Sequence, residues 1–359
     1  MVTSIFFTIR STFAQAHHKS KLKAAIHDNN ESFRYWRRRK MVKYDCPFDK
    51  STQEEAEKEL RETSEIRESA LEKIQEWIEK NPRIETCRTD PSFLLRFLRT
   101  KKFSMMQAQE ALERYLLLRQ TYGSMMFLKL DVQEPRMQEL LDQGYLFAVP
   151  GRDKYGRRII IARPGAFDMD KYANTDMCRI HGVTYETLME DEENQVRGYV
   201  HFCDGAGVAV RMLSLFTPKE AVRIVKNGER TLPMRHKEVH VINVHPSVKF
   251  AMDFAMTLVS EKIRKRVKLH SNVEEVHEHI DKSLLPKEYG GTIPMAEMIE
   301  SWKKELLAKR EMLLSNDDMR VREDLFSEGA RQGAVSALRG GCGPQNDIMA
   351  GSFRKLAID

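Results

Sequence analysis

The sequence has no long apolar run and few cysteines. No window approaches the roughly 18 consecutive apolar residues that a spanning helix requires, so we expect a soluble protein whose membrane contact is peripheral. Its five cysteines are widely spaced and include no C-x-x-C pair. This pattern suits free thiols in a reducing compartment and suits neither a disulfide framework nor a zinc site. A chain of 359 residues can hold two modest domains with tails.

A nucleotide-binding loop is also missing. The segment Asp204-Gly205-Ala206-Gly207 follows an expected strand, but the third glycine of a G-x-G-x-x-G motif would fall at Val210. No phosphate-binding lysine follows it. We therefore interpret the segment as a tight turn, and we predict no cofactor.

Catalytic and metal-binding motifs are equally absent. There is no G-x-S-x-G elbow, and neither Cys178 nor Cys203 has a base at a diagnostic spacing. His277 and His279 are two residues apart and would point in different directions from a helix. The sequence therefore predicts no catalytic residue and no metal site, and we expect that the protein is not an enzyme.

Basic charge is concentrated at the start of the chain. Residues 1–43 hold ten Lys and Arg residues against Asp28 and Glu31, a net charge of +8 within a total of +6. A nucleic-acid binder would carry its basic residues on a folded face, so we expect no nucleic-acid partner. The beginning of the chain faintly resembles a transit peptide. Two further interpretations stay open. Residues 1–50 form a disordered basic extension, or Met1 is a mispredicted start and Met41 is the true initiator.

The first third of the chain has helical periodicity. Thr52 and Glu55 form a capping-box pattern, and Asn81-Pro82 ends the periodic segment that follows. Asp90-Pro91 opens another expected helix. We predict an all-helical domain over residues 51–125.

Strand patterns begin near Tyr145. The apolar runs YLFAV and RIIIA flank a turn at 150–156, as in a hairpin. Two more short strands are expected at 199–203 and 239–242, with helical stretches between the strands. This alternation predicts an α/β fold, in which an N-terminal helical bundle precedes a mixed or parallel sheet covered by helices.

The later domain boundaries follow from the loss of periodicity. A capping box at 217–220 opens one of the helices between the strands. We assign residues 126–310 to the α/β domain. The Gly-rich remainder, residues 311–359, is predicted to be a flexible tail.

Two adjacent segments suggest binding. Residues 246–260 are apolar over more than half of a helix circumference, which indicates either a buried helix or one that alternates between two surroundings. In the segment that follows, Lys262 lies one helical turn from Arg266. Their repulsion costs tenths of a kcal/mol, which a bound polyanion would reverse. The alternative is a solvated basic helix end.

The sequence resembles the CRAL-TRIO family of lipid-transfer proteins over roughly residues 55–310. The segments that carry the resemblance are PSFLLRFLRTKKFS, DKYGRRIIIARPGAFD, the turn at 204–207, HVIN, SEKIRKRVKLH and LLPKEYGGTIP. It is most similar to the animal branch that contains the α-tocopherol transfer protein, cellular retinaldehyde-binding protein and the clavesins. The ending GSFRKL is similar to arthropod members of this branch.

The resemblance implies a lipid cavity between the sheet and a helical gate, at which residues 246–260 fall. The family positions carried over to this cavity are Cys178, His181, Tyr185, Tyr199, His201, Cys203, Ile224, Val239, Phe254 and Leu258. Several of these side chains end in a polar group, so the ligand is expected to bear a hydroxyl or a carbonyl.

The same branch has a basic cleft for phosphoinositide headgroups. The corresponding positions here are Lys101, Arg235, Lys237, Lys262 and Arg266. One further basic position of the branch is occupied by Glu110. The gate ending Lys-Pro-Phe-Leu is also replaced, by residues 256–259.

The resemblance therefore implies an intracellular carrier of one tocopherol-, retinoid- or other lipid-like molecule. It would exchange this cargo at phosphoinositide-containing membranes, as a cytoplasmic monomer with transient contact at membranes such as the endosomal one. The alternative is a phosphoinositide-recognising trafficking adaptor without exchangeable cargo. An oxidoreductase is disfavoured by the missing phosphate loop.

Overall fold

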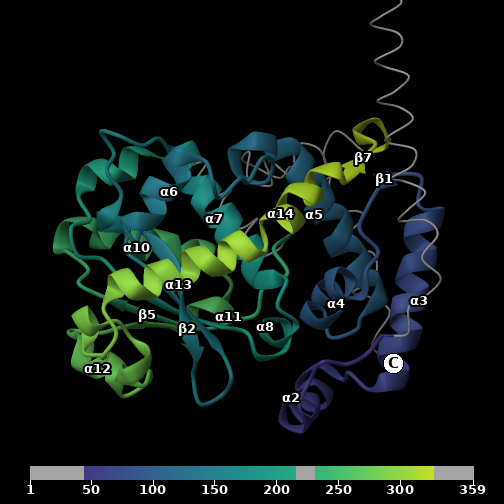
Figure 1. Cartoon of the computed structure of the whole chain (residues 1–359), viewed down its shortest axis with the longest axis horizontal. Helices are drawn as coiled ribbons and strands as arrows, with labels where there is room; N and C mark the ends of the chain where they lie inside the picture. The colour runs from purple at the N-terminus through teal and green to yellow at the C-terminus, as the bar shows by residue number, and fades with distance from the viewer. Residues whose placement is uncertain (1–43, 216–230, 327–359) are drawn as a thin grey trace, which may run out of the picture. The chain divides into compact units, whose positions relative to one another are not determined.

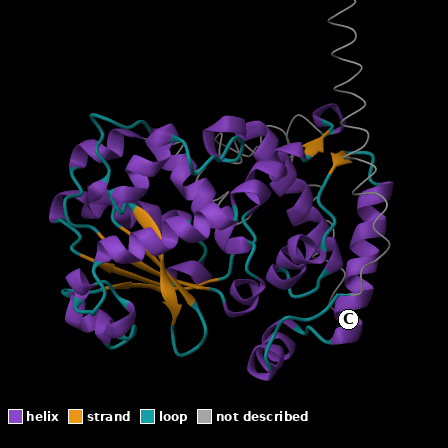
Figure 2. Ribbon diagram, viewed as in Figure 1, coloured by secondary structure: helices purple, strands orange, loops and turns teal. Residues whose placement is uncertain are grey.

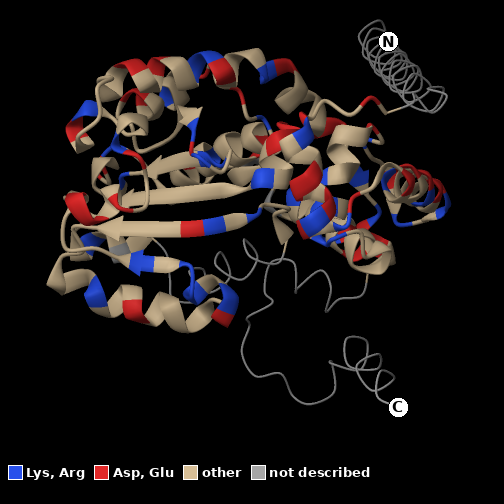
Figure 3. Ribbon diagram, turned by 90° about the horizontal axis from the view of Figure 1, so that it is seen from below, with Lys and Arg blue, Asp and Glu red and all other residues tan. Residues whose placement is uncertain are grey.

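A five-stranded sheet lies between helices in the computed structural model, which describes residues 44–215 and 231–326 (Figures 1 and 2). The chain divides into two units, residues 1–46 and 47–359, and all described helices and strands belong to the second. Figure 3 shows helices on both faces of the sheet, with acidic and basic segments interspersed along them. None of the described helices is long and apolar enough to cross a membrane.

The sheet is mixed, as the sequence predicts. Its strands, in spatial order, are β2 (Leu146–Arg152), β3 (Arg158–Ala162), β4 (Tyr199–Asp204), β5 (His236–Ile242) and β6 (Val267–Leu269). β2 and β3 form the antiparallel hairpin, and β3 to β6 run parallel. Asp204 to Gly207 form the expected turn after β4, in which Gly207 has a φ of 77°.

The part that precedes the sheet is helical. It contains α2 (Lys50–Glu55), the π-helix η1 (Ala56–Leu60), α3 (Ser64–Lys80), α4 (Pro91–Thr100), α5 (Met105–Met126) and α6 (Pro135–Asp142). The predicted capping box at Thr52 is wrong in detail, because Asp49 caps α2 and accepts a hydrogen bond from the Thr52 amide at 2.7 Å. α5 is kinked at Gly123, whose φ of 40° favours glycine.

The remaining described α-helices flank the sheet or follow it. They are α7 (Asn174–Met189), α8 (Glu192–Arg197), α10 (Pro246–Leu258), α11 (Glu261–Arg264), α12 (Val273–His277), α13 (Met295–Ala308) and α14 (Arg310–Ser315). The predicted capping box at 217–220 lies outside the described residues.

Residues 311–326 are structured, which corrects the predicted flexible tail over that range. α14 is followed by β7 (Arg320–Val321), which pairs antiparallel with β1 (Ile84–Thr86) of the helical part. The Gln120 side chain donates to the Val321 carbonyl at 3.1 Å and accepts from the Val321 amide at 2.9 Å. These bonds satisfy the backbone groups of Val321 in β7, a strand that is too short to show periodicity in the sequence.

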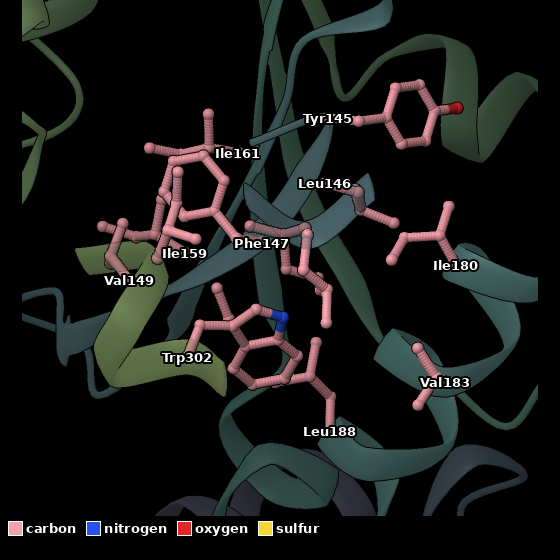
Figure 4. Close-up of a cluster of buried hydrophobic side chains, with 14 of the residues drawn as sticks. Tyr145, Leu146, Phe147, Val149, Ile159, Ile161, Ile180, Val183, Leu188 and Trp302 are labelled. Carbon is pink, nitrogen blue, oxygen red and sulfur yellow. The ribbon is translucent and has the colours of Figure 1, made fainter. Parts of the chain in front are cut away.

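The main core joins α7 and α13 to β2 and β3. Trp302 of α13 belongs to the same buried cluster as Leu188 and Val183 of α7 (Figure 4). At Gly182, an added Cβ would lie 2.0 Å from the Met126 carbonyl oxygen. Glycine therefore lets α7 approach the end of α5, and this close approach fixes the helix that carries much of the candidate site.

Buried ion pairs connect the helical part to α7 and α8. Arg99 of α4 is fully buried, donates two bonds of 2.8 Å to Glu62 and donates a third, of 2.9 Å, to Glu192. Arg96, also buried, donates to Glu190. Because an unpaired buried charge costs several kcal/mol, these pairs select one docking geometry for α4.

Candidate functional site

The floor of the candidate site is formed by one face of β4 and β5. In the parallel register His201 lies beside Val239, and Cys203 lies beside Val241. His201, Cys203 and Val239 are half-buried. Tyr199, predicted to share this face, is only 1% exposed, and its hydroxyl donates to the Leu188 carbonyl at 3.0 Å. It is therefore buried beneath α7, and its role in ligand binding stays a prediction.

α7 supplies a second wall. Cys178, His181 and Tyr185 are all half-buried. The His181 ring is hydrogen-bonded on both sides, to the Tyr145 hydroxyl through Nε2 at 2.9 Å and to the Tyr185 hydroxyl through Nδ1 at 3.1 Å. One imidazole nitrogen carries the proton in the neutral ring, so one tyrosine accepts from His181 and the other donates to it. The tyrosine that accepts keeps its own O–H for another partner.

The two walls meet in a set of polar, hydrogen-bonding side chains. His201 Nε2 and His236 Nδ1 are 2.8 Å apart. Burial lowers the pKa of His201 well below its usual value, and the neighbouring His236 and His181 rings lower this pKa further. Burial raises the pKa of Tyr145 far above its usual value, and the nearby Tyr185, Cys203 and Cys178 side chains contribute. The structure therefore brings these predicted residues together around two that were not predicted, Tyr145 and His236.

Burial keeps these groups neutral. It lowers the pKa of His181 to about 4, raises that of Tyr185 to about 12 and raises that of Cys203 to about 11. These pKa shifts are typical of a protein core, from which water is excluded, yet the side chains themselves are only half-buried. Such walls can donate to or accept from an uncharged hydroxyl or carbonyl, but they offer no permanent charge to a carboxylate.

α10 is more exposed than a buried helix would be. Val248 is its one buried residue, whereas Phe250 is 62% exposed and Phe254 is 49% exposed. Leu258 is half-buried at the end of the helix. Ile224 lies outside the described residues. The roles of Phe254, Leu258 and Ile224 in ligand binding stay predictions.

Three of the predicted headgroup residues surround the start of β5. Arg235 donates to the Glu59 carboxylate and to the Val196 carbonyl, and Lys237 donates to the same Glu59 oxygen at 2.7 Å. Arg266 donates to the His236 carbonyl. Burial lowers the pKa of Arg266, and the charge of Arg235 lowers it further.

The other two predicted headgroup residues are also within electrostatic reach of each other. Burial lowers the pKa of Lys101, and the charges of Arg114 and Lys262 contribute to this shift. Glu110, which departs from the family pattern, pairs with Arg114 one turn along α5 at 2.5 Å. Burial and neighbouring like charges thus disfavour the charged forms of Lys101 and Arg266, and a nearby anion would favour those forms.

Comparison with known proteins gives matches over most of the described chain. Residues 142–291 match the family model for the CRAL/TRIO domain, and residues 63–137 match that for the Pinta-like UBA domain. Clavesin-1 of Xenopus laevis is 30% identical over 257 residues, which cover 71% of this chain and 77% of that protein. Clavesin-2 of Homo sapiens is 29% identical over 277 residues, which cover 77% of this chain and 83% of that protein. The solved structure titled "Crystal structure of Sfh5" aligns with a TM-score of 0.47 and 14% identity, over 76% of this chain and 99% of that chain.

Proposed function

This chain belongs to the CRAL-TRIO family of lipid-binding proteins, and we propose that it is a carrier that encloses one uncharged, hydrophobic small molecule and releases it at membranes. The observation that supports this proposal most directly is the pair of neutral, half-buried walls around Tyr145 and His236. In an apolar surrounding, a few placed hydrogen-bonding groups orient a ligand whose affinity comes from the burial of its apolar surface.

The neutrality of the walls restricts the class of cargo. A cation beside a carboxylate would stabilise it best, but burial lowers the pKa of His181 and of His201 and so favours their uncharged forms. A hydroxyl or carbonyl needs only one donor or acceptor, which the Tyr145–His181–Tyr185 chain supplies. We therefore propose a lipid alcohol, aldehyde or ketone in preference to a fatty acid.

The membrane half of the proposal is supported by α10 and the basic residues near it. Phe250 and Phe254 expose large apolar side chains on one helix. α11, which follows directly, carries Lys262 and Arg264 in its last turn. Apolar groups beside basic ones suit the interface of an anionic bilayer, where burial of rings and attraction to headgroups act together. We propose that Lys101, Arg235, Lys237, Lys262 and Arg266 contact phosphoinositide headgroups there, and that the protein acts as a cytoplasmic monomer.

The cargo proposal is tested by native mass spectrometry of the purified chain, followed by extraction and identification of any bound lipid. We expect one neutral lipid per chain. Cys178→Trp, which adds bulk to the α7 wall, should reduce the bound fraction severalfold. Thr175→Trp is the matched control, because Thr175 is exposed on the same helix. Equal loading of both variants would show that the α7 wall does not face the cargo.

A second candidate function is that of an adaptor, which recognises anionic membranes without carrying cargo. The exposed rings of α10 favour it. Phe250 and Phe254 could enter a bilayer whether or not a ligand lies behind the helix. The two functions differ in one measurement. An adaptor would sediment with anionic vesicles, yet it would neither retain a lipid through purification nor take up a fluorescent lipid alcohol.

A further inference from the structure

An acidic segment covers part of the proposed headgroup site. We call residues 50–60, which form α2 and η1, the acidic strap. Its Glu59 carboxylate accepts from both Arg235 and Lys237, and Glu55 lies 3.8 Å from the Lys237 ammonium. Two of the five cations proposed to bind a headgroup are thus already paired with carboxylates of the same chain.

The exposure of these side chains shows which group is outermost. The Glu59 side chain is 41% exposed, whereas Arg235 and Lys237 are 13% and 19% exposed. Glu59 is therefore the most exposed member of this cluster, and both cations are more buried than the carboxylate that they contact. Burial alone would raise the pKa of Glu59, but Lys237 and Arg235 lower this pKa, so the carboxylate keeps its charge. An anion that binds Arg235 or Lys237 must therefore compete with a charged carboxylate already in contact with both.

The strap stays docked without this pair. Ala56 and Leu60 form a small buried cluster with Val196 of α8. Glu55 accepts from Arg197 at 2.5 Å, and Arg197 also donates to the Ser51 and Thr52 hydroxyls at 2.9 Å. Arg235 is held independently by the Val196 carbonyl. Rotation of the Glu59 side chain would free Arg235 from its carboxylate partner and would leave Lys237 with only the longer contact to Glu55, at 3.8 Å.

We infer that Glu59 is a built-in competitor for the anion-binding site, which a phosphorylated headgroup must displace in order to bind. This inference rests on the proposed headgroup site. A site that is free in only a fraction of molecules binds every anion more weakly by that fraction. Weakly binding, singly charged lipids then fail to occupy it, while a multiply phosphorylated group offers several charge-assisted hydrogen bonds in place of one carboxylate. Only an anion that binds tightly enough to displace Glu59 therefore occupies the site.

The decisive experiment titrates the full chain with inositol trisphosphate by calorimetry. We expect Glu59→Gln to bind it about fivefold more tightly or better than the unmodified chain, a coupling at the lower end of the usual range. Glu57→Gln is the matched control, because Glu57 is an exposed residue of the same helical turn. Glu59→Ala should repeat the gain, which separates loss of the charge from an effect of the introduced amide.

A vesicle arm distinguishes a lipid headgroup from a free inositol phosphate. Phosphatidylcholine vesicles containing phosphatidylserine should recruit Glu59→Gln more strongly than the unmodified chain, and vesicles containing phosphatidylinositol bisphosphate should do the same. A gain with inositol trisphosphate but with neither vesicle supports the competitor and assigns the site to soluble inositol phosphates. Equal binding by the unmodified chain and Glu59→Gln overturns the competitor while leaving the headgroup site in place. Absence of binding to both probes in all variants overturns the headgroup site itself, and the competitor with it.

Discussion

Acid should weaken the fold through His181. Its ring lies between two tyrosine hydroxyls, and burial lowers its pKa to about 4. The unfolded chain would titrate this group near its ordinary value of about 6.5. The pKa of His181 is lower in the folded chain than in the unfolded chain, so folding is favoured while the ring is neutral. This contribution is complete above about pH 6.5 and is lost progressively as the pH falls toward about 4.

The two pKa values set the size of the effect. For a single group with these pKa values, acidification from about pH 7 to about pH 5 lowers the free energy of unfolding by at most about 2 kcal/mol. The pKa values of His201, His240 and His270 are also lowered, and these groups add to the loss in the unmodified chain. The quantity to measure is therefore the difference between the unmodified chain and His181→Gln, which keeps hydrogen-bonding groups but cannot titrate.

Urea unfolding followed by circular dichroism at the two pH values provides the measurement. We expect His181→Gln to be less stable at neutral pH but to lose about 2 kcal/mol less on acidification than the unmodified chain. His245→Asn, at the exposed N-cap of α10, controls for replacing a histidine in general, because Asn can also accept the cap bond from the Ser247 amide. If His181→Gln loses as much stability as the unmodified chain, the ring is solvated in the folded state and the desolvated α7 wall is refuted.

Two further predictions concern buried and surface charge. Arg99→Met should lower the free energy of unfolding in urea by about 3–5 kcal/mol, because it leaves the buried Glu62 carboxylate without its main partner. Restoration of much of this loss in the double variant with Glu62→Gln would identify the unpaired charge as the cause, whereas a loss below about 1 kcal/mol would mean that the pair is solvated. Changing Lys262 and Arg266 together to Ala should abolish the preference for phosphoinositide vesicles in sedimentation at physiological salt. Retained preference would show that these two residues are only a solvated basic helix end.

The sequence predicts the fold best where the determinants are local. The hairpin of β2 and β3 follows from two apolar runs around a turn, and the predicted α/β class with an N-terminal helical part is confirmed. The family predicted from ordered motifs is confirmed as well. β1, β6 and β7 were missed because each has three residues or fewer, too few for alternation to show, and because β1 and β7 pair across most of the chain.

The site was harder to predict because its residues meet through distant contacts. The spacing of His181 and Tyr185 indicates a shared helix face, but no local pattern indicates that Tyr145 completes their hydrogen-bond chain from the start of β2. Likewise, a helix pattern for α4 places Phe97 and Leu98 inside. It does not show that Arg99 is buried with them, since that depends on Glu62 from another helix.

One residue connects the two halves of the proposed function. The His236 ring contacts His201 on the floor of the candidate cargo site, while its backbone carbonyl accepts from Arg266 of the proposed headgroup site. Its neighbours in sequence, Arg235 and Lys237, are the cations paired with Glu59. A headgroup that draws Arg266 away removes a bond from the residue whose ring supports the cargo floor. Linkage is reciprocal, so if headgroup binding changes cargo affinity through this pair, cargo binding changes headgroup affinity by the same factor. The start of β5 is therefore the element through which membrane contact and cargo release can be coupled.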